Sequence, residues 1–185
     1  MGAATLLTLE QFSALPEYDQ RTGSSYELDH GELIVVSPQG WEHERLKREV
    51  LLLLSRYFEE RGLARRTVVG SGFSLDEESW RKPDVAVMSE EALRQAQLDP
   101  TRPLEGAPEL SIEIASPSDN SAMIGRKVDH FLAAGTKTVW VIYPATRQVH
   151  VHKAGRKTVK LGSEHFLEEP DILSGFRIQI AQMLA

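Results

Sequence analysis

Two acidic residues on strand-like segments carry the first chemistry that the sequence suggests. Glu113 lies in residues 110–115, where polar and apolar residues alternate, so its side chain shares a face with small residues only. Asp84 lies in residues 83–88 and shares its face with Ala86. Small neighbours leave room for a ligand, and carboxylate oxygens are the donors that Mg²⁺ and Mn²⁺ prefer. The sequence therefore predicts that Asp84 and Glu113 hold a hard divalent cation.

Lys127 lies on the apolar side of a helix expected over residues 120–134. At about 100° per residue it falls between Met123 and Phe131, inside the apolar arc. An ammonium group that faces the core without a partner is costly, so Lys127 is expected to meet a carboxylate. There it could orient or deprotonate an attacking water and stabilise a phosphorane-like charge. Two alternatives stay open: the ammonium reaches out to water, or the three residues form only a buried ion-pair network.

His43 is a further candidate, near the start of a helix expected over residues 41–61. It falls within the apolar stripe that contains Leu46 and Leu54, so its side chain points inward. We expect it to line the site or to bind a substrate phosphate. A histidine that is satisfied within the core is the alternative interpretation.

The elements that must position these residues follow from periodicity and turn residues. Helices and strands come in mixed order, which predicts a single α/β domain over residues 1–185 with a mixed sheet. The strand expected over residues 138–143 is nearly all apolar and should be central. The other expected elements are helices over 8–15, 41–61, 90–97 and 120–134, a hairpin over 26–37, and strands over 67–75, 83–88, 110–115, 148–153, 157–161 and 175–180.

Composition limits the classes of function. Cysteine is absent from the 185 residues, which excludes disulfides, thiolate catalysis and cysteine-bound zinc. No apolar run approaches the ~20 residues of a membrane helix, and the N-terminus lacks a signal-peptide pattern, so a cytoplasmic protein without a membrane partner is expected. The net charge of −6 repels phosphate, so a nucleic-acid binder of this composition needs a basic patch or a metal ion.

Six segments occur in the order and approximate spacing of a large bacterial family: YELDHGE, WEH, RKPDVAVM, ELSIEIASPSD, GRKVDHF and WVIYP. On these segments the chain resembles the Uma2-like (DUF820) endonucleases of the PD-(D/E)XK superfamily. The resemblance runs from Leu9 to the GFRIQI segment near the C-terminus. It implies a restriction-endonuclease-like fold, with a central mixed sheet flanked by helices, and Mg²⁺-dependent (or Mn²⁺-dependent) cleavage of phosphodiester bonds. It also implies DNA as the substrate and a homodimer.

The resemblance assigns roles to individual positions. It makes Asp84 the motif aspartate and Glu113 the acidic residue of the third motif. Ala115 stands where the superfamily normally has a lysine, and Lys127 matches the position to which that lysine migrates in related families. Glu27 corresponds to the glutamate of the YEL segment and could complete the metal shell; the alternative is a carboxylate on a strand surface.

Two other functions stay open beside a DNA endonuclease. One is a binding or assembly module that kept the nuclease fold without catalysis, which the acidic net charge favours. The other is a phosphodiesterase that acts on small nucleotides. Without a metal, a shared site also predicts that at least one of Asp84 and Glu113 has a raised pKa, because like charges lie close together.

Overall fold

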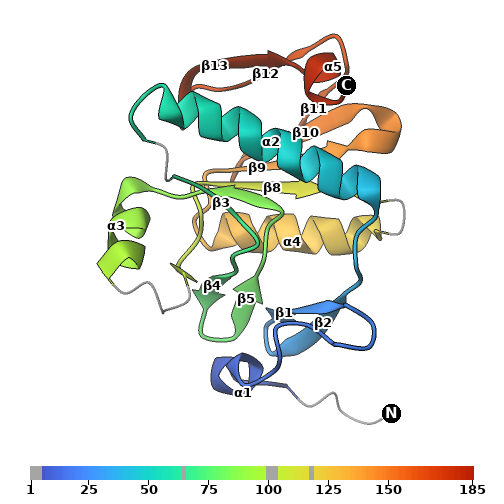
Figure 1. The fold of residues 1–185 in the computed structure, drawn as a ribbon, viewed down its shortest axis with the longest axis vertical. Coiled ribbons are helices and arrows are strands. Elements are labelled where there is room, and N and C mark those ends of the chain that lie inside the picture. The colour runs from blue at the N-terminus through green and yellow to red at the C-terminus, as the bar shows by residue number, and fades with distance from the viewer. Residues whose placement is uncertain (1–5, 64–65, 99–103, 117–118) are drawn as a thin grey trace.

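The computed structural model describes residues 6–63, 66–98, 104–116 and 119–185. A six-stranded mixed sheet forms its centre, with helices on both faces (Figure 1). The strand order is β11-β10-β9-β8-β6-β3, and β8 and β9 pair in parallel while the other neighbours pair antiparallel. The α/β fold with a central mixed sheet is therefore confirmed. The strands are β3 (Thr67–Val69), β6 (Val85–Val87), β8 (Leu110–Ile114), β9 (Thr138–Tyr143), β10 (Gln148–His152) and β11 (Val159–Leu161).

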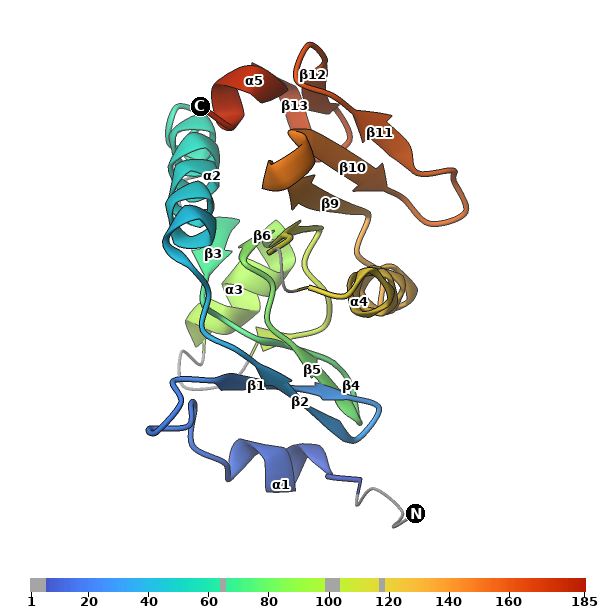
Figure 2. The same ribbon diagram turned by 90° about the vertical axis from the view of Figure 1, so that its right-hand side faces the viewer.

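Helix α2 (Trp41–Glu59) covers one face of this sheet because it carries an apolar residue at every fourth position. Its stripe packs on the inner residues of β6, β8 and β9. A C-terminal hairpin and a short helix complete the same core, on the side of the sheet where α2 lies (Figure 2). The residues of the stripe are Leu46, Val50, Leu54 and Phe58, and the C-terminal elements are β12 (Phe166–Glu169), β13 (Leu173–Gln179) and α5 (Ile180–Met183).

Helix α4 (Ser121–Ala133) covers the opposite face, where Val128 and Phe131 pack on β9. Its first turn is capped by Asn120, whose side-chain oxygen accepts a hydrogen bond from the Ala122 amide at 2.8 Å. Helix α3 (Glu90–Leu98) lies farther along the same face. Within the described ranges, none of the helices has both the length and the apolar character needed to cross a membrane.

A second sheet lies below α4 in Figure 1 and has the order β2-β1-β5-β4-β7. Its hairpin β1–β2 pairs Glu27 with Ile34 and closes at the Asp29–Glu32 pair, as the expected turn requires. A one-turn helix, α1, precedes it, with Thr8 and Gln11 forming a capping box. The bounds are α1 (Leu9–Ser13), β1 (Ser25–Asp29), β2 (Glu32–Val36), β4 (Phe73–Asp76), β5 (Ser79–Arg81) and β7 (Leu104–Glu105).

The single strand expected over residues 67–75 is in fact two strands in different sheets. β3 pairs with β6 in the central sheet, whereas β4 pairs with β5 and β7 in the second sheet. Gly70, at φ 71°, lies between them in the left-handed region, and the chain changes direction there. The sequence pattern did not indicate this break, because polar and apolar residues can go on alternating when the chain passes from one sheet to another.

Gly72 is the second glycine in this connection, and it allows a close approach of Trp80. A Cβ atom at this position would lie 1.7 Å from Trp80 Cζ2. We expect Gly72→Ala to lower the free energy of unfolding by roughly 1–3 kcal/mol, since the indole must move out of its packed position. Gly125→Ala is the matched control, because Gly125 lies inside α4 with nothing within 4 Å of its added Cβ. Urea denaturation should show Gly125→Ala unchanged or stabilised by about 0.5–1 kcal/mol, and equal midpoints for both variants would contradict this account of Gly72.

Candidate active site

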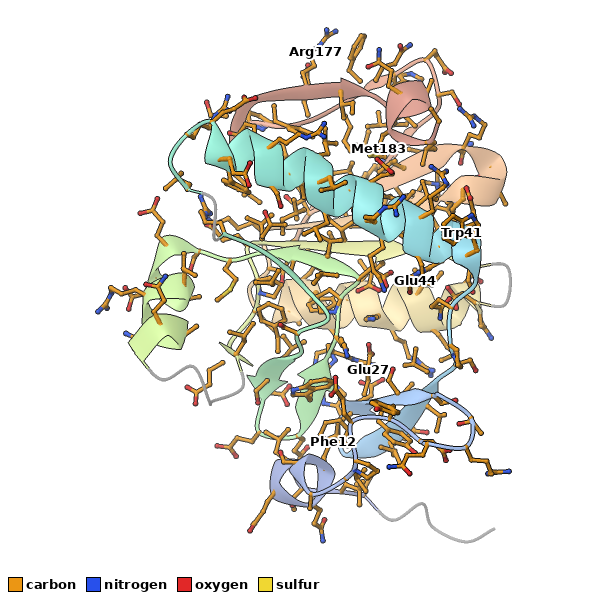
Figure 3. The ribbon with its side chains drawn as sticks, in the orientation of Figure 1. Phe12, Glu27, Trp41, Glu44, Arg177 and Met183 are labelled. Atoms are coloured by element: carbon orange, nitrogen blue, oxygen red, sulfur yellow. The ribbon has the colours of Figure 1, made fainter. Side chains whose placement is uncertain are left out.

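A cleft of about 490 Å³ opens between the two sheets. The β1–β2 hairpin, the start of α2, the entry to β6, the end of β8 and the first turns of α4 all line it. Figure 3 shows Glu27, from β1, and Glu44, from α2, on the two sides of this region. Five residues predicted from the sequence line this cleft together: Glu27, His43, Asp84, Glu113 and Lys127.

Asp84 and Glu113 meet because of strand register. Val85 pairs with Ile112 in the antiparallel β6–β8 ladder, so the register carries Asp84 to the side of Glu113. The Ile114 amide donates a hydrogen bond to Asp84 Oδ2 at 2.8 Å, which fixes the aspartate against β8. The expected proximity of the two acidic side chains is therefore present in the structure.

Lys127 reaches both sheets from α4. Its Nζ lies 2.8 Å from Glu27 Oε1 and 2.9 Å from Glu113 Oε2, and it donates to the Lys82 carbonyl oxygen at 3.0 Å. These three contacts use all three protons of the ammonium group. The side chain is only 19% exposed, so the interpretation in which the ammonium extends into water is wrong. The helical periodicity correctly indicated that Lys127 would meet carboxylates.

The burial of Glu27 decides against one of the two interpretations considered for it. Glu27 is buried, so it is not a carboxylate on a strand surface. Its Oε1 accepts hydrogen bonds from Lys127 Nζ and, at 3.2 Å, from the Lys82 amide, while its Oε2 accepts one from Arg81 Nη1 at 3.2 Å. Both oxygens are therefore engaged by cationic or amide donors. This arrangement suits a residue that holds Lys127 better than one that binds a cation.

His43 points inward, as its place in the apolar stripe indicated, and it is 7% exposed. Its Nε2 lies 3.1 Å from Asp84 Oδ2. Burial alone would lower the pKa of His43, but the hydrogen bond and the charge of Asp84 outweigh it, so this pKa is raised above its usual value. The imidazole therefore holds the same oxygen of Asp84 as the Ile114 amide does, and it lies at the wall of the cleft.

Burial is the main cause of the electrostatic state of Glu113. It raises the pKa of Glu113 to about 8, with the charges of Asp84 and Glu27 adding to the effect and Lys127 opposing it. The raised pKa was expected, but its expected cause, repulsion between like charges, ranks below desolvation.

The same carboxylates act on Lys127 in the opposite direction. Burial would lower the pKa of Lys127, yet Glu113, Glu27 and Asp84 together raise it above its usual value. Lys127 is therefore a protonated donor around neutral pH. Of the two roles considered for it, deprotonating a water is disfavoured, and orienting a water or stabilising negative charge is favoured.

The oxygens of Asp84 and Glu113 fit a hard divalent cation. Glu113 Oε1 is buried and has no hydrogen-bond partner among the residues that the structure describes. A buried carboxylate oxygen without a partner is costly, and a cation or a proton relieves that cost. Both hydrogen bonds that Asp84 makes with the described residues use Oδ2, so Oδ1 remains for a ligand. An all-oxygen donor set of this kind suits Mg²⁺ or Mn²⁺.

A second group of possible ligands, Asp29, His30 and His130, was not anticipated from the sequence. Their ligand atoms lie within 4.8 Å of one another. However, Arg81 Nη2 lies 2.6 Å from Asp29 Oδ2, and Arg81 Nε donates to His130 Nδ1 at 3.2 Å. The guanidinium already supplies positive charge here, so this group fits a cation less well than Asp84 and Glu113. The buried Arg81 was also not predicted from the sequence. The available signal was the spacing of Lys127 and His130, which are three residues apart on one helix face and both lie beside the partners of Arg81.

A mixed sheet between helices, with one acidic residue at the entry to a strand, another on the adjacent strand and a lysine from the next helix, defines a restriction-endonuclease-like protein. The chain belongs to the Uma2 family, whose model matches residues 9–181 and carries the description "Putative restriction endonuclease". A solved structure described as a "putative nuclease belonging to DUF820 from Anabaena variabilis ATCC 29413" superposes with a TM-score of 0.78 and 21% identity. The match covers 96% of this chain and 97% of that one, and it shows the shared fold. No curated protein sequence matches the chain.

Proposed function

We propose that this protein is a metal-dependent nuclease that hydrolyses phosphodiester bonds of DNA. One observation carries the proposal: Asp84, Glu113 and Lys127 converge in one cleft, and Glu113 presents a buried oxygen without a partner among the described residues. A buried ion pair can also leave such an oxygen, as Glu169 does beside Lys153, but Glu169 lies outside the cleft that Glu113 shares with Asp84. Membership of the Uma2 family agrees with this function.

In this proposal Asp84 and Glu113 would hold Mg²⁺ or Mn²⁺, and the cation would supply positive charge to the phosphate and lower the pKa of a water. When Glu113 turns to the cation, the proton that Lys127 gives to Glu113 Oε2 becomes available for the negative charge that develops on the phosphoryl oxygens. Glu27 fixes the Lys127 ammonium at 2.8 Å, and Arg81 balances the charge of Glu27. His43 holds Asp84 Oδ2, which keeps the aspartate in one orientation.

The test is cleavage of plasmid DNA and of short oligonucleotides with Mg²⁺ or Mn²⁺. We expect Asp84→Ala to lower the rate by roughly 100-fold or more, since a metal ligand and the contact with His43 are both lost. Asp171→Ala is the control, because Asp171 is an exposed carboxylate that pairs with Lys153 at 3.0 Å on the C-terminal hairpin side. Activity that survives Asp84→Ala or an excess of chelator would rule the mechanism out.

The same assay separates the other two functions. A non-catalytic binding module would show no cleavage that depends on Asp84, although it could still bind a nucleic acid. A phosphodiesterase for small nucleotides would cleave model diesters rapidly and show no affinity for DNA.

A further inference from the structure

We infer that the cleft takes a single nucleic-acid strand, with a base inserted between the β1–β2 hairpin and the start of α4, and not a double helix. This inference rests on the proposed function and names the form of its substrate. Three features support it: two facing apolar walls, a recessed floor, and a small number of unpaired cations.

The hairpin supplies the first apolar wall. Paired residues of an antiparallel ladder share a face, so Ile34 lies on the same face as Glu27, its partner, and Val36 lies two residues farther along that face. Both are half-buried and line the cleft. Leu33 leaves the strand on the opposite face and does not line the cleft. The hairpin therefore presents apolar side chains next to the proposed catalytic groups.

The first turns of α4 supply the second wall. Met123 is 44% exposed and lines the same cleft, four residues before Lys127. Exposed apolar side chains beside a phosphodiesterase centre are unfavourable against a phosphate backbone but favourable against the flat faces of bases. Bases that leave a stack are commonly held between apolar or aromatic side chains.

The floor of the cleft lies too deep for a duplex. The side chains of Asp84, Glu113 and Lys127 are 19%, 12% and 19% exposed. A volume of about 490 Å³ is that of a small-ligand pocket. A duplex keeps its bases stacked inside a wide, rigid backbone surface, so an intact duplex would rest on the apolar rim with its phosphates above the floor. A single strand can bring a phosphate down to Asp84 and Glu113.

The available cations fit one backbone. Arg126 is exposed, lines the cleft, and has no ion pair among the described residues, while Lys82 has only a 3.6 Å contact with Glu17. By contrast, Lys47 is paired with Glu44 at 2.6 Å. Two available cations can contact phosphates on either side of the inserted base. A duplex binder of net charge −6 would need a longer basic surface, because duplex affinity depends on many phosphate contacts.

The test measures binding by fluorescence anisotropy with Asp84→Asn protein in Mg²⁺, so that cleavage does not interfere. Three labelled probes of equal length are compared: a single strand, the same sequence as a blunt duplex, and the single strand with central abasic sites. We expect the single strand to bind about tenfold more tightly than either of the other two. Ile34→Asn and Met123→Asn should each weaken single-strand binding about fivefold to tenfold and leave abasic binding unchanged.

Leu33→Asn is the matched control for Ile34→Asn, since it places the same side chain one residue away on the other face of β2. Met123→Asn keeps the test valid if Ile34→Asn does not fold, because Met123 is exposed and can be replaced without disturbing the core. Duplex binding as tight as single-strand binding, or equal effects of Ile34→Asn and Leu33→Asn, would overturn the inference. Cleavage by the wild type is measured separately. Binding of single strands without cleavage would support this inference and reject the nuclease function. Cleavage of duplex DNA that does not depend on Ile34 or Met123 would support the nuclease function and reject this inference.

Discussion

Lys127→Met is expected to reduce DNA cleavage by about 100- to 1000-fold, the usual cost of removing one donor that stabilises a transition-state charge. The same change should destabilise the metal-free protein by about 3 kcal/mol, because Glu27 and Glu113 then lose the cation 2.8 and 2.9 Å away. Methionine keeps most of the packing of the lysine stem, so the lost charge is the main difference. Rates should be measured under single-turnover conditions, and stability by urea denaturation in a chelator.

The double variant Glu27→Gln/Lys127→Met is the control for the stability effect. Removing one negative charge with the positive one should restore much of the lost free energy of unfolding, while cleavage stays low. Addition of Mn²⁺ should also stabilise Lys127→Met more than it stabilises the wild type. Cleavage by Lys127→Met at the wild-type rate would contradict the catalytic role of Lys127. An unchanged denaturation midpoint of this variant in chelator would contradict the ion-pair geometry.

The affinity for Mn²⁺ is expected to fall about 50-fold between pH 8 and pH 6, and the fall approaches about tenfold per pH unit at the lower end of this range. The reason is that burial raises the pKa of Glu113 to about 8, so the cation must displace a proton from this carboxyl in that range. Calorimetry in two buffers with different heats of protonation should show release of about one proton per cation at pH 7.

His43 also has a raised pKa and contacts Asp84, so His43→Gln is needed to isolate the contribution of Glu113. The dependence of Mn²⁺ affinity on pH should remain in His43→Gln. It should disappear in Glu113→Gln, which binds the cation more weakly. Affinity that is constant between pH 6 and 8 would contradict a protonated Glu113.

The same raised pKa has a consequence for stability in chelator. A carboxyl whose folded-state pKa lies above its unfolded value favours the folded state at low pH and loses that contribution as the pH rises toward 8. Glu113→Gln should therefore remove part of the decline in stability between pH 5 and 8.

The sequence predicted much of this architecture because its local signals are strong. The four-residue apolar spacing of α2, the alternation in β8 and the nearly continuous apolar run of β9 each determine an element without reference to the rest of the chain. The same periodicities placed Glu113 and Lys127 on faces that do meet. The positions of these side chains could be predicted because each of these polar residues interrupts an apolar pattern, while their roles in catalysis stay predictions.

Long-range arrangement could not be predicted in the same way. The split between β3 and β4 depends on which strands they pair with, and strand partners are not a local property. No local pattern indicates the burial of Arg81, which follows only from the position of Glu27 and Asp29 on a separate hairpin. The contacts of Glu27, and the grouping of Asp29, His30 and His130, could not be predicted for the same reason, because they too depend on how distant segments pack together.

The contact of Lys127 with Glu27 joins α4 to the β1–β2 hairpin, so these two charges hold the molecule together as well as lining its cleft. Relatives without nuclease activity would then still be expected to keep this pair, because losing either partner would loosen the hairpin. Asp84 and Glu113 do not contribute to this contact with the hairpin. In a survey of relatives, joint retention of Asp84 and Glu113 should therefore separate active enzymes from inactive ones, whereas retention of Glu27 and Lys127 should not.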